Sequence, residues 1–147
     1  QARAGRLGHR FAVRLNGTSD LDFYSIYQSF PEVQFYDYTK NPKRVPLPNY
    51  HLTFSYSQGT EARVKHYMQA VARGQSIAFP VRADDFENAC ALPDCFSMDK
   101  TDLRFLDKSG KYGILKAKNT VNLSDGIKEN FILSLQELCA VISKIEG

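Results

Sequence analysis

Hydrophobic and polar residues alternate along several short segments of this 147-residue chain. Such alternation is typical of β-strands that bury one face. Between these segments, apolar residues recur every three or four positions, which predicts helices. Strands are expected over 11–16, 33–39, 50–57 and 76–82, and helices over 21–30 and 61–73. The order strand, helix, strand therefore occurs twice.

Two such units normally pair their strands in parallel through right-handed crossovers. The pattern therefore predicts a single α/β domain with a mainly parallel sheet, either open or curled into a partial barrel. Residues 83–102 show little periodicity, which indicates a long loop. Residues 103–118 resemble a hairpin whose turn lies at 107–110.

A final helix is predicted to begin near Ser124 or Asp125 and to end at about Ile145, so it spans about 125–145. Its apolar residues are spaced by threes and fours, as on one face of a helix. They either pack on the protein's own sheet or form a seam for a partner helix.

Composition and charge exclude several classes of protein. Apolar residues make up 43% of the chain and charged residues 24%, as in an ordinary folded domain. The net charge of +3 is lower than a dedicated nucleic-acid-binding domain usually carries, although residues 1–10 form a basic tail. No apolar run approaches the ~20 residues that a membrane span needs, so no membrane contact is expected. Three cysteines, an odd number, favour a reducing cytoplasmic setting.

The alternation also separates two faces of the predicted sheet. One face is apolar, as expected where helices cover it. The other carries hydrogen-bonding and aromatic side chains, namely Arg14, Asn16, Gln34, Tyr36, Tyr38, His51, Thr53 and Ser55. This polar face is either open to solvent or lines a hollow that binds a ligand.

Open α/β sheets bind ligands beyond the carboxyl ends of their strands. In this sequence those ends carry Ser19, Asp20, Tyr38, Thr39, Lys40 and Ser55. Arg14 and Lys40 are candidates to hold an anion, and Tyr36 or Tyr38 to stack on a nucleotide base.

Two residues are candidates for proton transfer. His51 has an ordinary pKa near neutrality, which suits a general base. Asp20 either handles protons or caps the following helix, a role that Ser19 could also fill. The sequence contains no P-loop, glycine-rich dinucleotide motif, nucleophile elbow or HExxH motif. No zinc-ligand spacing is evident, so no metal site is predicted and no cofactor is assigned.

Several of these segments resemble a family of bacteriophage proteins of the gene product 88 type. The resemblance rests on 13–20, 30–40 and 49–55, with a weaker match at 103–107 and 115–118. It implies a phage origin and an α/β fold, but no established reaction. By motif match it implies a common site at Asn16, Ser19, Asp20, Tyr36, Tyr38, Thr39, Lys40, Thr53, Ser55, Arg104 and Asp107. The tail from Asn119 onward lies outside the resemblance.

Two functions remain open, and neither requires that the protein be an enzyme. The first is a phage α/β protein in the host cytoplasm with a polar crevice for a nucleotide or another small anion. The alternative is a non-catalytic interaction or counter-defence protein. It would bind a host protein or nucleic acid through a surface that includes the helix at 125–145.

Overall fold

A computed structural model describes residues 8, 10–108, 110–118 and 131–147. Six strands form one open sheet in which every pair is parallel, so the predicted parallel α/β architecture is confirmed. Their order across the sheet is β1-β2-β3-β4-β6-β5. The strands are β1 (Ala12–Val13), β2 (Gln34–Thr39), β3 (Tyr50–Ser55), β4 (Ile77–Val81), β5 (Cys95–Ser97) and β6 (Tyr112–Lys116).

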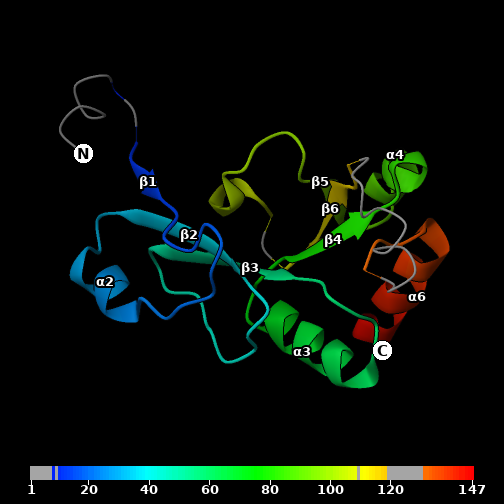
Figure 1. Ribbon diagram of the computed structural model, residues 1–147, viewed down its shortest axis with the longest axis horizontal. Coiled ribbons are helices and arrows are strands. Elements are labelled where there is room, and N and C mark those ends of the chain that lie inside the picture. The colour runs from blue at the N-terminus through cyan, green and yellow to red at the C-terminus, as the bar shows by residue number, and fades with distance from the viewer. Residues whose placement is uncertain (1–7, 9, 109, 119–130) are drawn as a thin grey trace.

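The helices lie mostly on one face of the sheet (Figure 1). They are α2 (Tyr24–Ser29), α3 (Glu61–Ala72), α4 (Phe86–Cys90) and α6 (Leu135–Glu146), with two short 3-10 turns, η1 (Ala83–Asp85) and η2 (Arg104–Leu106). Ser134 and Glu137 form a capping box at the start of α6, which satisfies backbone N–H groups that the helix leaves open.

The hydrophobic core lies between this face and the helices. Phe54, Phe79 and Ile114 of the sheet are almost fully buried against Tyr67 of α3 and Leu138 of α6. A second cluster packs α2 on the other half of the sheet and contains Tyr27, Val33, Phe35, Tyr50 and Leu52. The apolar face inferred from strand alternation is therefore the helix-covered face.

The opposite face is partly covered by the segment 98–107, which we call the covering segment. Figure 1 shows it crossing the side of the sheet away from α3. Met98 is buried over β6, where a Cβ at Gly113 would lie 2.1 Å from the Met98 sulfur. Glycine at this position thus lets the covering segment approach the strand closely. Phe105 contacts Tyr36 of β2, with ring centroids 5.6 Å apart.

Two predicted elements are wrong. Residues 83–102 contain η1, α4 and β5 rather than a loop without secondary structure. The hairpin at 103–118 forms only its second strand, because Arg104–Leu106 is a 3-10 turn. β6 lies between β4 and β5 and pairs with both in parallel, so neither of its edges is left for a hairpin partner.

The final helix begins at Leu135, later than predicted, and residues 119–130 lie outside the described part of the chain. Its apolar residues Leu138, Val141, Ile142 and Ile145 are buried in the protein's own core. Within the described residues, no helix has the length and apolar character needed to cross a membrane.

Candidate functional site

A cleft of about 710 Å³ lies over the carboxyl ends of β2, β3, β4 and β6, within the size range of small-ligand sites. The sheet supplies Tyr38 and Ser55, together with the less polar residues Ala78, Pro80 and Leu115. The covering segment supplies the opposite wall through Met98, Asp99 and Asp102. We call this hollow the strand-end cleft.

Three lysines line the strand-end cleft. Lys40 follows β2, while Lys116 ends β6 and Lys118 comes two residues later. All three are exposed, and none forms an ion pair with another described residue. The Lys40 ammonium lies 5.3 Å from the ring centre of Phe131, which also lines the cleft. The Lys116 ammonium lies 5.6 Å from the ring centre of Phe86, which is outside the cleft lining, so Lys40 and Lys118 are the better placed of the three for an anion in the cleft.

A smaller hollow of about 390 Å³ adjoins the strand-end cleft. It shares Tyr38, Lys40 and Ser55 with the larger hollow and adds residues 18–20 and Thr39. Lys40 therefore lies where the two hollows meet.

Tyr38 offers an aromatic surface beside these charges. The Arg14 guanidinium carbon lies 4.9 Å from the centre of its ring. Burial raises the pKa of Tyr38, although the nearby Arg104 charge opposes the shift, so the phenol is protonated at neutral pH. A flat aromatic ring next to cations is the combination that binds nucleotides in many proteins.

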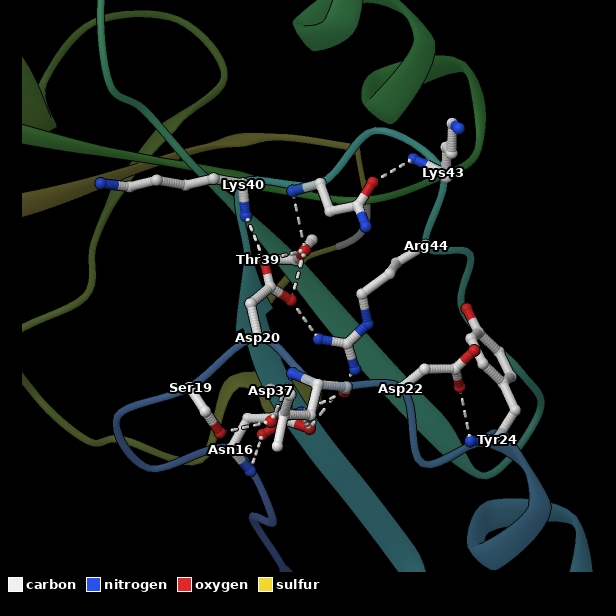
Figure 2. A network of polar contacts seen from close by, with 12 residues as sticks. Asn16, Ser19, Asp20, Asp22, Tyr24, Asp37, Thr39, Lys40, Lys43 and Arg44 are labelled. Atoms are coloured by element: carbon white, nitrogen blue, oxygen red, sulfur yellow. Dashed lines mark hydrogen bonds and ion pairs between the residues drawn. The ribbon is translucent and has the colours of Figure 1, made fainter.

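Asp20 connects the smaller hollow to the turn that carries Lys40 (Figure 2). Its carboxylate accepts a hydrogen bond from Thr39 Oγ1 at 2.8 Å and from the Lys40 backbone N–H at 3.0 Å. It also forms an ion pair with Arg44. Burial alone would raise the pKa of Asp20, but the hydrogen bonds from Arg44, Thr39 and Lys40 outweigh it and lower the pKa.

Arg44 and Asp37 extend this contact into the core. Arg44 donates to the Tyr50 hydroxyl, and its Nη2 lies 3.8 Å from Asp37 Oδ2. Asp37 is fully buried and accepts hydrogen bonds from Asn16 N at 3.0 Å, Asn16 Nδ2 at 3.1 Å and the Tyr27 hydroxyl at 2.9 Å. Figure 2 shows the Arg44 guanidinium between the two carboxylates. This buried polar network therefore ties the loop before α2 to β2 and β3.

Burial also raises the pKa of two tyrosines in the network, to about 12 for Tyr27 and upward for Tyr50. Both hydroxyls consequently stay protonated at neutral pH and can donate to Asp37.

The sequence profile of Gene product 88 matches residues 1–133 of the chain. The chain belongs to the Gene product 88 family. It is therefore a phage-type protein, and the match extends past Asn119, where the motif resemblance had stopped. No curated protein and no solved structure matches the chain.

Within this family member, the residues predicted from the polar face separate into two groups. Tyr38, Lys40 and Ser55 line the strand-end cleft, with Thr39 and Asp20 in the adjoining hollow and Arg14 stacked on Tyr38. His51, Thr53 and Tyr36 do not line the two hollows. Tyr36 lies under the covering segment, Thr53 is fully buried, and His51 is adjacent to both in the sheet.

Three predicted positions need correction. Asn16 does not lie on the polar face, because β1 ends at Val13 and the alternation stops there; its side chain binds Asp37 on the helix face instead. Asp20 and Ser19 do not cap α2, because that helix begins only at Tyr24, and Ser19 donates to the Asn16 side chain.

The last two residues implied by the family resemblance, Arg104 and Asp107, form a buried ion pair within the covering segment. Arg104 is 1% exposed, donates from Nη2 to the Met98 carbonyl at 3.1 Å, and has its Nη1 3.3 Å from Asp107 Oδ2. Burial raises the pKa of Asp107, with Arg104 opposing the shift. The pair lies outside the lining of the cleft and, with the Met98 carbonyl, holds together the segment that forms its wall.

Sequence reasoning missed Lys116, Lys118 and Arg44. The two lysines were detectable, since Lys116 ends the last strand and Lys118 follows it, and the strand-end rule applies to that strand as well. Arg44 lies in a proline-containing loop without periodicity, so no local pattern indicates its partners.

His51 gives a prediction about pH. Burial and the Arg104 charge lower its pKa from 6.5 to about 4, so it is uncharged at neutral pH. Below about pH 6.5 the unfolded chain binds a proton that the folded protein accepts only near pH 4. Stability should therefore decrease between pH 7 and pH 4.5, with His51 contributing about 2 kcal/mol of the loss.

Urea unfolding of the wild type and His51→Gln at both pH values measures this contribution. The variant should lose less stability on acidification than the wild type. An equal loss in the two proteins would show that His51 is accessible to protons in the folded state.

Proposed function

We propose that this phage protein binds a nucleotide, or an anion of similar chemistry, in the strand-end cleft. The observation that carries the proposal is the arrangement of Lys40, Lys116 and Lys118 around one hollow without ion-pair partners among the described residues. Ammonium groups bind phosphate through charge-assisted hydrogen bonds, which are stronger than neutral ones.

The chemistry of the other lining residues supports a nucleotide rather than a bare anion. Tyr38 and Phe131 contribute aromatic rings, each with a cation close to it. Asp99 and Asp102 limit the positive charge and supply acceptors for amino or hydroxyl groups. A polyanion without a ring would leave the aromatic surfaces unused.

The surroundings of Asp20 and His51 favour roles in binding and folding over a role in proton transfer. The lowered pKa of Asp20 keeps it ionised in its contact with Arg44. His51 lies outside the cleft lining. We therefore propose a binding role without assigning a reaction.

The free state of Cys90, Cys95 and Cys139 agrees with a reducing compartment such as the host cytoplasm.

The alternative, a partner that docks on the final helix, has less support. The apolar side of α6 packs against β4 and α3 and is therefore occupied by the protein itself.

Isothermal titration with ADP and with adenosine tests the proposal. ADP should bind at least about tenfold more tightly than adenosine, because adenosine lacks the groups that the lysines would hold. The ADP affinity should also fall as sodium chloride is raised, since salt screens exposed charges. Equal affinity for the two compounds, or no binding of ADP, would refute the proposal.

A further inference from the structure

Arg44 lies outside the lining of both hollows, yet it is joined to Lys40 through one side chain. We infer that Arg44 is a positioning residue for ligand binding. It holds the Asp20 carboxylate, and Asp20 in turn fixes the turn that presents Lys40 to the cleft. The inference rests on the proposed function, since it concerns the same anion site.

The contacts form a continuous chain from the core to the cleft. Arg44 is held by the Tyr50 hydroxyl and lies near Asp37, and its side chain is only 4% exposed. Its other terminal nitrogen pairs with Asp20, whose two oxygens also accept from Thr39 Oγ1 and the Lys40 backbone N–H. The guanidinium therefore fixes Asp20 from a buried and well-held position.

The turn after β2 depends on Asp20 for its shape. Thr39 Oγ1 donates to Asp20 and accepts from the Asn41 backbone N–H at 3.0 Å. The Lys40 backbone N–H is also bound to Asp20, while the Lys40 side chain extends away from this carboxylate (Figure 2). One carboxylate thus sets the direction in which Lys40 leaves the strand.

Arginine suits this role because its planar fork can bind two partners in fixed directions. A lysine at position 44 could keep the charge contact with Asp20, but it could not also bind Tyr50 with the same geometry. A methionine would fill a similar volume and remove both contacts.

Amide hydrogen exchange measures, without any ligand, how firmly the turn that carries Lys40 is held. In Arg44→Met, the Lys40 amide should exchange at least about tenfold faster than in the wild type, because Asp20 is no longer held as its acceptor. Arg44→Lys should give an intermediate rate.

Arg73→Met is the matched control. Arg73 also anchors the loop after β2, through a 2.7 Å hydrogen bond to the Pro42 carbonyl, but it has no contact with Asp20. This variant should leave exchange at Lys40 unchanged. If Arg44 only stabilised the loop in a general way, the two variants would act alike and the inference would fail.

ADP titration then tests the consequence for binding. Arg44→Met should bind ADP about tenfold more weakly than the wild type, and Arg44→Lys should recover most of that loss. Faster exchange at Lys40 with unchanged ADP affinity would overturn the inference. If ADP does not bind the wild type, the proposed function fails, whereas exchange at Lys40 still decides whether Arg44 positions the turn.

Arg44→Met leaves the Asp37 carboxylate buried without its cation, which could prevent folding. The double variant Arg44→Met/Asp37→Asn removes that charge as well and keeps the shape of the side chain. The same exchange and titration results are expected of it, with Asp37→Asn alone as its reference.

Discussion

Replacing Asp37 with alanine should lower the free energy of unfolding by about 3–5 kcal/mol, the cost typical of breaking a buried ion pair. The carboxylate is completely buried and accepts hydrogen bonds from Asn16 and Tyr27. Its removal leaves these donors without an acceptor and leaves Arg44 with Asp20 as its one remaining carboxylate in the network. Because small domains have only 5–15 kcal/mol of stability, the variant should be close to unfolding at physiological temperature.

Urea unfolding measures this loss, and Asp22→Ala is the control. Asp22 is exposed and accepts one hydrogen bond, from the Tyr24 backbone N–H at 2.9 Å. Its replacement should cost no more than about 1 kcal/mol. Similar losses of unfolding free energy in the two variants would mean that the buried network stabilises the fold no more than a local turn contact does.

Much of the sheet was predictable because strand burial has a period of two. β2, β3 and β4 alternate clearly or carry strong strand formers, and they lie within two residues of their expected bounds. β5 has three residues and follows a short helix, so it is too short to show an alternation of hydrophobic and polar residues. β6 was found as a strand, but its neighbours depend on the order of strands across the sheet, which alternation does not encode.

The candidate site was predictable only where side chains follow strand direction. Tyr38, Lys40 and Ser55 were placed together by the rule that parallel strands end at one edge of a sheet, and they share one cleft. Asn16 was misplaced because it lies three residues beyond the two-residue strand β1.

The buried network could not be read from the sequence for a related reason. Arg44 and Asp20 are 24 residues apart and meet only because two loops fold back over β2. Asp37, in turn, occupies an apolar-face position of that strand. A buried carboxylate at such a position is the local signal that a partner must exist, but it does not identify which residue that is.

Reversing the charge of Lys40 should have the largest effect on ligand binding. Lys40 lines both hollows, so its ammonium is placed to contact a phosphate group in either. Lys40→Glu replaces an attraction with a repulsion and should weaken ADP binding by about 100-fold or more. The fold should be preserved, because the Lys40 backbone N–H, which binds Asp20, is unchanged.

Lys65→Glu is the matched charge reversal, made on the exposed surface of α3 beside Glu61 and outside the lining of the cleft. The decisive measurement is the dissociation constant for ADP of the wild type, Lys40→Glu and Lys65→Glu by calorimetry at one ionic strength. If the strand-end cleft is an anion site, the affinity for ADP should fall about 100-fold in Lys40→Glu and should change by no more than about threefold in Lys65→Glu. ADP binding of wild-type strength in Lys40→Glu would contradict it.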